Sequence, residues 1–304
     1  MTNKDFKVGA DPEFVGITGE NPERAASLVN NSRSKERVSD GGGTGVCAVI
    51  HKGGFGADGS GRPFELRPDP SFDPIEVVSN IQDILKRAAM TERSLAAMTW
   101  KAGAMPCGWP IGGHIHLGTK INGSHAIGAE SGSCLLDNYV GAICALVEGP
   151  EGAERRRGSG YGKAGACREQ DHGFEYRTPA SWLTSPHVAA GMLCLSKTVI
   201  YEAINNPDAR FSNIGAAPYI NAGDVKTLRG KFSRIWEDIT RMKLYQDYKQ
   251  FIDVLYFLVD KKLTWEPSIG MKQAWGVDDP EISMPHRLHL SAIWSRYNQE
   301  VCHG

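Results

Sequence analysis

Four short, strand-like stretches of this 304-residue chain each carry two ionisable side chains that lie two positions apart. Residues i and i+2 of a β-strand point to the same face, so each pair would project from one side of a sheet. If the strands share a sheet, four carboxylates, two guanidinium groups and two imidazoles gather on one face, with Asp58 on a neighbouring turn. The pairs are Asp11 and Glu13, Glu65 and Arg67, His114 and His116, and Glu175 and Arg177.

Four carboxylates on one face repel one another, and this repulsion raises their pKa values unless cations are present. Mg²⁺ or Mn²⁺ would relieve it, because both ions prefer carboxylate oxygens and often lie between protein carboxylates and substrate phosphates. Taken singly, each pair also has a structural explanation. Asp11 before a proline can begin a turn, the Glu–Arg pairs can be exposed cross-strand ladders, and the histidines can be core residues. The four pairs together favour a metal and phosphate site.

Composition narrows the class of protein. Lys and Arg number 34 and Asp and Glu 35, so the net charge of −1 predicts no general attraction to nucleic acid or to an anionic membrane. The longest apolar stretches fall short of the roughly 18 residues that a membrane-spanning helix needs. The seven cysteines are scattered and the first residues are polar. This pattern predicts a reduced, cytoplasmic protein.

The order of the expected elements is typical of an α+β fold. Asp73 as N-cap, Pro74 at the first helical position and Glu76 in a capping box predict a helix from residue 74. An exposed loop is expected at 19–40, and the strands expected at 46–51 and 62–67 could form a hairpin with a turn at residues 56–61. The expected strands are 7–17, 46–51, 62–67, 109–117 and 174–178, and further helices are expected at 135–147, at 188–204 and in the region after 224.

The segment 154–168 is rich in arginine and glycine and is expected to be a loop. It contains no Walker motif, because three residues rather than four separate Gly158 from Gly162 and because alanine follows Lys163. Its cations could still clamp phosphates, since arginine binds phosphate oxygens bidentately. For residues 155–157 a solvated surface loop is equally compatible, whereas the position of Lys163 and Arg168 among glycines favours function.

These motifs resemble those of the carboxylate-amine ligases of the glutamine synthetase and glutamate-cysteine ligase superfamily, above all the phage-type amidoligases of type 2. The resemblance covers residues 5 to 205 and rests on four motifs. They are Gly9-Ala10-Asp11-Pro12-Glu13-Phe14, Asp58-Gly59-Ser60 leading to Glu65-Leu66-Arg67, Gly113-His114-Ile115-His116-Leu117-Gly118, and Tyr161-Gly162-Lys163 leading through Arg168 to Glu175-Tyr176-Arg177.

The resemblance implies a curved antiparallel sheet with helices packed on its outer face, which binds ATP with Mg²⁺ or Mn²⁺. It implies two groups of metal ligands and one group of phosphate contacts. Glu13 and Glu65, with Asp58, would bind the metal nearest the acyl-phosphate chemistry. Asp11, His114 and Glu175 would bind the metal on the nucleotide phosphates, and the phosphate contacts would be His116, Lys163, Arg168 and Arg177.

The implied reaction is ATP-dependent formation of an amide or peptide bond. ATP would convert a carboxylate into an acyl phosphate, and an amine would then displace the phosphate. Arg168 and Arg177 are the candidates for stabilising the charge of the phosphoryl-transfer transition state. Asp58 is the first candidate for the base that accepts the proton of the amine.

Three other readings of the residues stay open. A guanidino kinase of the same superfamily would need a cysteine near the reacting guanidine, for which Cys107 and Cys167 are candidates. A metal-dependent hydrolase could use the histidines and carboxylates to hold a water-activating ion, although the clustered cations favour bound phosphate. A non-catalytic phage protein could retain the fold.

The expected organisation is a catalytic core at 1–210 and a mostly helical extension at 211–304 that packs on the core. The expected partners are a small-molecule or peptide carboxylate and an amine, without general binding of nucleic acid or membrane. The apolar stripes of the C-terminal helices fit a core better than a surface, so a homo-oligomer is the less favoured use of them.

Overall fold

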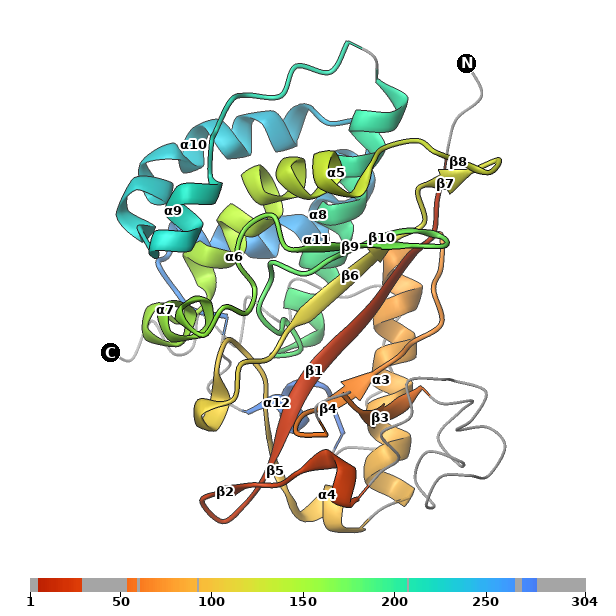
Figure 1. Cartoon of the computed structure of the whole chain (residues 1–304), viewed down its shortest axis with the longest axis vertical. Coiled ribbons are helices and arrows are strands. Elements are labelled where there is room, and N and C mark those ends of the chain that lie inside the picture. The colour runs from red at the N-terminus through yellow and green to blue at the C-terminus, as the bar shows by residue number, and fades with distance from the viewer. Residues whose placement is uncertain are drawn as a thin grey trace.

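A single long strand, β1 (Val8–Thr18), organises the main sheet. Its first half pairs with β6 (Gly113–Leu117), and its second half pairs with β4 (Phe64–Leu66), β5 (Thr99–Lys101) and β2 (Asn21–Pro22). The sheet continues to β3 (Phe55–Ala57) on one side and to β10 (Gly173–Tyr176) and β9 (Cys167–Gln170) on the other. Each of these pairs is antiparallel, in the order β3-β4-β1-β6-β10-β9 (Figure 1), which confirms the expected class of sheet.

The structure is a computed structural model that describes residues 5–28, 54–58, 61–91, 93–206, 208–265 and 270–277. The strand expected at 46–51 and residues 29–40 of the expected loop lie outside these ranges. The hairpin of β4 is formed with β3, which contains Gly56 and Ala57, two residues that the sequence placed in the turn. A separate small hairpin joins β7 (Lys120–Ile121) to β8 (Ser124–His125).

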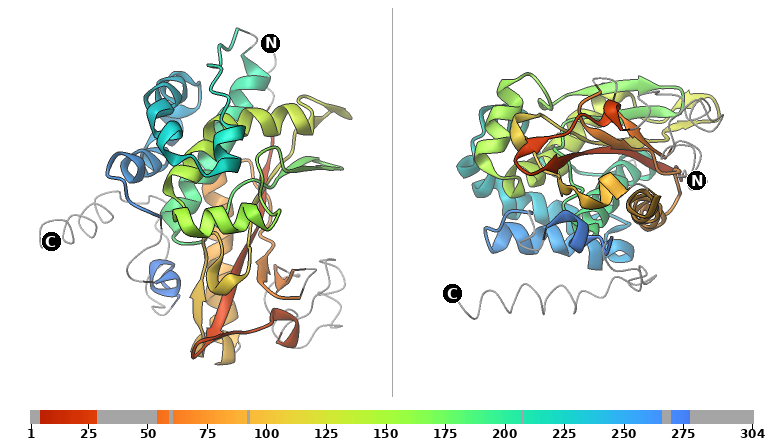
Figure 2. Two further views of the ribbon diagram at one scale, coloured as in Figure 1. Left: turned by 60° about the vertical axis from the view of Figure 1, so that its left-hand side comes forward. Right: turned by 90° about the horizontal axis from the view of Figure 1, so that it is seen from below.

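Side chains of the main sheet alternate between two faces. Val8, Ala10 and Phe14 of β1 are buried in the hydrophobic core together with Ile115 and Leu117 of β6. The same core includes apolar residues of α3 (Pro74–Thr91) and α8 (Pro186–Asn205), so these helices cover the apolar face (Figure 2). The intervening, ionisable residues of the strands therefore belong to the opposite face.

The remaining helices lie between and after these elements, and none of the helices in the described ranges is long and apolar enough to cross a membrane. α11 packs along α8, and α10 packs on α6 and α11. The division near residue 210 stays a prediction. The helices are α4 (Arg93–Ala97), α5 (Ala129–Leu136), α6 (Ala142–Val147), α7 (Pro150–Gly158), α9 (Ala217–Ala222), α10 (Val225–Arg241), α11 (Tyr245–Asp260) and α12 (Met271–Ala274), with short turns η1 (Ala25–Ser27), η2 (Pro106–Gly108) and the π-helical η3 (Asp137–Gly141).

Several boundaries differ from the sequence prediction for local reasons. The Asp73 carboxylate caps α3 by accepting from the Ile75 amide at 3.0 Å, as expected. Glu76, however, accepts from the Ser71 hydroxyl, so the reciprocal capping box is not formed. Residues 106–108 form η2, and β6 begins only at Gly113. The helix expected at 135–147 begins at Ala129 and continues through η3 into α6.

The expected arginine and glycine loop begins as a helix. α7 ends at Gly158, so the three consecutive arginines lie in its last turn, where cations interact favourably with the helix dipole. Arg156 is fully buried, and the buried Arg157 pairs with the buried Glu148. The interpretation of residues 155–157 as a phosphate clamp or a solvated loop is therefore wrong for two of the three, because their guanidinium groups are satisfied inside the protein.

Candidate active site

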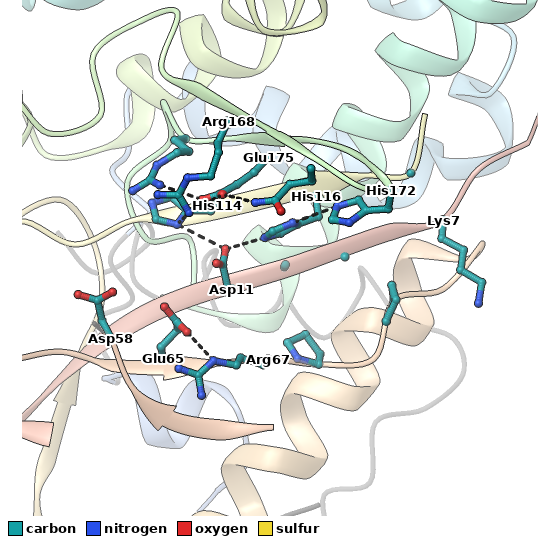
Figure 3. A pocket seen from close by; sticks show the side chains of 17 residues that line it. Lys7, Asp11, Asp58, Glu65, Arg67, His114, His116, Arg168, His172 and Glu175 are labelled. Carbon is teal, nitrogen blue, oxygen red and sulfur yellow. Dashed lines mark hydrogen bonds and ion pairs between the residues drawn. The ribbon is translucent and has the colours of Figure 1, made fainter. Parts of the chain in front are cut away.

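A cavity of about 660 Å³ lies over the polar face of the main sheet. This volume is within the range of pockets for small ligands. Asp11, Glu65, His114 and Glu175 project into it from four different strands, and Asp58 follows the end of β3 (Figure 3). The other lining residues are Lys7, Gly9, Ala10, Arg67, Pro68, Pro70, His116, Gly118, Arg168, Gln170, His172 and Arg177.

The first acidic group combines Asp11 of β1, His114 of β6 and Glu175 of β10. The antiparallel register sets Asp11 opposite His114 and Glu175 opposite His116, so three adjacent strands deliver the group. His114 Nδ1 lies 3.4 Å from Asp11 Oδ1 and 3.4 Å from Glu175 Oε1. Glu175 and His114 are nearly fully buried, whereas the Asp11 side chain is 22% exposed toward the cavity.

Cations surround the buried Glu175 carboxylate. Arg177 Nη1 lies 3.2 Å from Oε1, and Arg168 Nη1 lies 3.1 Å from Oε2. The Gln170 side-chain amide also donates to Oε2, at 3.0 Å. The Arg168 side chain is more than half exposed, so part of its guanidinium remains available to a ligand in the cavity.

Two further histidines, His116 and His172, line the cavity. His116 Nε2 lies 3.2 Å from Asp11 Oδ1, and His116 Nδ1 lies 3.3 Å from His172 Nε2. Burial opposes ionisation of Asp11, but the rings of His114 and His116 outweigh burial and hold its pKa below the ordinary value. Burial acts against the charged form of His116 as well, yet the interaction with Asp11 raises its pKa. Asp11 and His116 thus favour each other's charged form at the cavity wall.

The second acidic group lies one step along β1. Glu13 stands directly opposite Glu65 in the pairing of β1 with β4. Its Oε2 accepts a hydrogen bond from the Gly112 amide at 2.6 Å and lies 3.3 Å from the Tyr161 hydroxyl. Only glycine fits at position 112, because a Cβ there would stand 2.4 Å from His114 Nε2.

Charge repulsion is concentrated in this second group. Burial raises the pKa of Glu13 well above its ordinary value, and the charges of Asp58 and Glu65 add to the effect. Burial also raises the pKa of Glu65 to about 7, although Arg67 opposes the shift. Glu13, Asp58 and Glu65 therefore make a site at which an added cation would relieve a large electrostatic cost.

Arg67 forms one edge of the cavity. Its Nε donates to Glu65 Oε1 at 2.6 Å and its Nη2 to the Ala57 carbonyl at 3.0 Å. The third nitrogen, Nη1, is buried and makes no hydrogen bond, and the side chain is only 9% exposed. Since a buried guanidinium donor without an acceptor is costly, Arg67 presents a donor that an anion in the cavity could satisfy.

The donor atoms of both groups suit a hard divalent cation. One donor atom from each of Asp11, His114 and Glu175 lies within 4.8 Å of the others, and the same holds for Glu13, Asp58 and Glu65. Glu175 Oε1 is buried and accepts no hydrogen bond. Carboxylate oxygens with a single imidazole are typical ligands of Mg²⁺ or Mn²⁺. The two groups thus fit two cations.

The structure brings most of the sequence-predicted site residues together. Nine of them line the cavity or complete an acidic group, namely Asp11, Glu13, Asp58, Glu65, His114, His116, Arg168, Glu175 and Arg177. Arg67, from the original pairs, lines the cavity as well. Lys163 is exposed and does not line the cavity, and its phosphate contact stays a prediction. Neither Cys107 nor Cys167 is a lining residue, so the geometry gives no support to a guanidino kinase.

Several contacts were not predicted from the sequence. Gln170 and His172 follow Arg168 at intervals of two, and this periodicity on β9 and its turn is a signal that could have found them. Tyr161 belongs to one of the motifs but was given no role, although its hydroxyl contacts a residue of each acidic group. Lys7 carries no distinguishing signal, because a single exposed lysine is common on any surface.

Comparisons with known proteins find one matching family and a similar solved structure. The family model of phage phiEco32-like COOH.NH2 ligase-type 2 matches residues 8–277. No curated protein matches the chain in sequence. Among solved structures, the complex between the prokaryotic ubiquitin-like protein Pup and its ligase PafA is similar, with 12% identity and a TM-score of 0.47 over 96% of this chain and 76% of that chain.

Proposed function

The chain belongs to the phage phiEco32-like COOH.NH2 ligase-type 2 family, and from this premise we propose that it joins a carboxylate to an amine with consumption of ATP. The carboxylate oxygen would attack the γ-phosphorus of ATP, which releases ADP and gives an acyl phosphate. The amine nitrogen would then attack the acyl carbon, release phosphate and lose one proton. The observation that carries the proposal is the pair of acidic groups on one sheet face, bordered by cations that can hold phosphate.

The distribution of charge along the cavity supports an orientation for the nucleotide. Arg67 lies on one side of Asp11, and Arg168 lies on the other side, across β6 and β10 (Figure 3). A polyphosphate over the Asp11 group would meet donors from both sides, including the unsatisfied Arg67 Nη1. Bidentate contacts from arginine would fix the phosphate and stabilise the charge that develops during its transfer.

The end of the cavity near Asp58 and Glu65 is acidic and suits the amine substrate. Asp58 lies within 4.8 Å of ligand atoms of Glu13 and Glu65, so an incoming ammonium would be attracted there. Asp58 is the member of this group that is not fully buried, and it is the candidate base for the amine proton. A small-molecule or peptide amine would fit a cavity of this kind, as would a carboxylate of the same class.

Divalent cations belong to the proposal as partners of the two acidic groups. Asp11, His114 and Glu175 would hold one Mg²⁺ or Mn²⁺, and Glu13, Asp58 and Glu65 would hold a second. Bound there, the cations would neutralise phosphate oxygens and favour phosphoryl transfer. The sheet would hold the metal-binding side chains in place, because they come from four of its strands.

Thermal unfolding tests the nucleotide and metal requirement without knowledge of the substrates. The unaltered chain and Glu65→Gln would be heated with ATP, with Mg²⁺ or Mn²⁺, with both and with chelator. A ligand present at about 100 times its dissociation constant adds ~2.7 kcal/mol of stability to the folded state. We expect ATP to raise the midpoint only with metal, and Glu65→Gln to lose this response. Stabilisation by metal with no further effect of ATP would instead favour the hydrolase.

An isotope experiment tests the acyl phosphate once a turnover assay exists. Pools of carboxylates and amines would be screened for release of ADP, and the active carboxylate would be labelled with ¹⁸O. Because a carboxylate oxygen attacks phosphorus, one labelled oxygen should appear in the released phosphate. Release of AMP and pyrophosphate would show activation by adenylation and would contradict the acyl-phosphate route.

A further inference from the structure

The Tyr161 hydroxyl joins the two acidic groups. Its oxygen lies 3.0 Å from His114 Nε2 and 3.3 Å from Glu13 Oε2, and these two residues belong to different groups. His114 in turn directs its other ring nitrogen, Nδ1, toward the carboxylates of Asp11 and Glu175. Tyr161 itself does not line the cavity.

A buried arginine holds Tyr161 in this position. The Arg156 guanidinium lies 5.0 Å from the centre of the Tyr161 ring and donates to three backbone carbonyls, those of Ile111, Thr178 and Pro179. Ile111 precedes β6, and Thr178 and Pro179 follow β10. The same side chain thus ties together the ends of two site strands and supports the phenol by a cation–π contact.

Glycine at position 162 makes this support possible. The residue has a φ of +67°, in the left-handed region that favours glycine, and a Cβ would fall on the Arg156 guanidinium. The Tyr161-Gly162 part of the motif is explained by this packing, because the glycine admits the arginine and the arginine holds the tyrosine. Lys163, the third residue of the motif, is exposed and takes no part in it.

The hydrogen bonds of the phenol constrain the imidazole. A phenol has one proton to donate, and the Tyr161 hydroxyl donates it to Glu13 Oε2. The phenolic oxygen is then left to accept from His114 Nε2–H. With the proton on Nε2, the lone pair of Nδ1 faces Asp11 and Glu175, which is the form that can bind a cation.

We propose that Tyr161 is a positioning residue that fixes His114 with its Nδ1 lone pair toward Asp11 and Glu175 and couples this group to Glu13. The inference rests on the proposed function only in that the two groups hold cations. In this arrangement Tyr161 touches neither substrate nor cation. It acts through the orientation of two ligands, one in each site.

Metal binding provides the first test. Binding of Mn²⁺ to the full chain without nucleotide would be measured from the electron paramagnetic resonance signal of free Mn²⁺. We expect Tyr161→Phe to weaken binding about 10- to 100-fold, the usual effect of removing a residue that orients a ligand. Tyr139→Phe is the matched control, because it also removes a buried hydroxyl that donates to a carboxylate, that of Asp238 at 2.8 Å, away from the cavity. It should bind Mn²⁺ like the unaltered chain.

The histidine tautomer provides a second test that needs no metal and no activity. Long-range ¹H–¹⁵N correlation spectra distinguish Nδ1–H from Nε2–H imidazoles, and His114→Gln identifies the signal of His114. In the metal-free protein Asp11 and Glu175 favour Nδ1–H and the Tyr161 hydroxyl favours Nε2–H, so we expect the fraction of Nε2–H to fall in Tyr161→Phe. Either an unchanged tautomer fraction or an unchanged Mn²⁺ affinity in Tyr161→Phe would overturn the inference.

The two proposals can fail separately. If the unaltered chain binds no Mn²⁺, the metal-dependent function fails, and with it the part of the inference that concerns cations. The tautomer spectra still decide whether Tyr161 sets the His114 ring. If the unaltered chain binds Mn²⁺ but Tyr161→Phe binds it equally well, the proposed function stands and the role of Tyr161 is refuted.

Discussion

Glu13 and Glu65 face each other directly across the antiparallel pair of β1 and β4. Like charges at such cross-strand positions are destabilising, and here both side chains are also buried. Glu65 lines the cavity over the sheet, and Glu13 and Asp58 lie beside it. The arrangement lowers the stability of the fold, and an added cation would relieve the repulsion at the same point.

The first prediction concerns pH and stability without metal. Because the pKa of Glu65 is raised to about 7 in the folded protein, its carboxyl favours the folded state most below the ordinary glutamate pKa. That contribution is lost as pH rises toward 7, at a cost of roughly 3 kcal/mol. Denaturant unfolding of the metal-free protein at several pH values measures the loss. Glu65→Gln should flatten the profile and be more stable than the unaltered chain at pH 8.

Cations should reverse this loss. Mn²⁺ or Mg²⁺ competes with protons for Glu13 and Glu65, so we expect a larger metal-induced rise of the melting temperature at pH 8 than at pH 5.5. Glu65→Gln should keep only the rise that comes from the Asp11, His114 and Glu175 group, with a smaller difference between the two pH values. A rise of the same size at both values in the unaltered chain would show that the cation binds elsewhere.

A second prediction separates the two cation sites. Glu175→Gln removes one carboxylate from the Asp11 group and leaves Glu13, Asp58 and Glu65 intact. We expect the number of tightly bound Mn²⁺ ions to fall from two to one, as measured by equilibrium dialysis. Glu169→Gln is the control, because Glu169 is exposed on the neighbouring strand β9. Loss of both ions in Glu175→Gln would mean that the groups form a single site.

A third prediction concerns Arg67. Its unsatisfied Nη1 should donate to a nucleotide phosphate, and the loss of a hydrogen bond to a charged group costs about 1.5–3 kcal/mol. We therefore expect Arg67→Gln to weaken binding of ATP in the presence of Mg²⁺ by roughly 10- to 100-fold, as measured by calorimetry. Arg87→Gln, which removes an exposed arginine on α3, should bind ATP normally.

Arg67 also contacts Glu65, and a separate measurement distinguishes the two roles. If Arg67→Gln acts only through Glu65, Mn²⁺ affinity should fall as much as ATP affinity. If the guanidinium contacts phosphate, ATP affinity should fall more. Normal ATP binding in Arg67→Gln would rule out the contact.

A fourth prediction tests the buried arginine of α7. Arg156→Ala would leave the carbonyls of Ile111 and Thr178 without a donor, remove one of the two donors of Pro179 and open a cavity, so we expect a loss of stability of at least about 3 kcal/mol. Arg155→Ala, at the exposed neighbouring position, should change stability by less than about 0.5 kcal/mol. Chemical denaturation of both variants measures the difference. Equal effects would show that Arg156 does not hold the strand ends.

The functional strands were predictable because alternation is a local property. Asp11 with Glu13, and His114 with His116, lie two apart, and in the structure each pair projects toward the polar face of one strand. The start of α3 at Pro74 followed in the same way from the capping residue Asp73. Each of these features depends on neighbours within a few residues, which the sequence lists in order.

The segment 154–168 was misjudged because its meaning depends on distant residues. Three adjacent arginines suggest a solvated or phosphate-binding loop. Nothing in the neighbouring sequence reveals that Arg156 donates to the carbonyls of Ile111, Thr178 and Pro179. Because charged side chains are rarely buried, the sequence predicts exposed arginines as long as their hydrogen-bond acceptors are unknown. The hairpin partner of β4 was misplaced for a related reason, since pairing is set by register rather than by the turn residues alone.

The order of residues along the chain is enough to predict which side chains share a strand face. The tertiary structure decided how these pairs combine. The order of the strands places Glu175 beside His114 and Asp11, and it places Glu65 and Asp58 beside Glu13. Residues from the four pairs thus form two acidic groups together with Asp58. The tertiary structure also brought Tyr161 between them. Strand periodicity is a consequence of backbone geometry, whereas strand order and the approach of distant loops depend on packing across the whole chain.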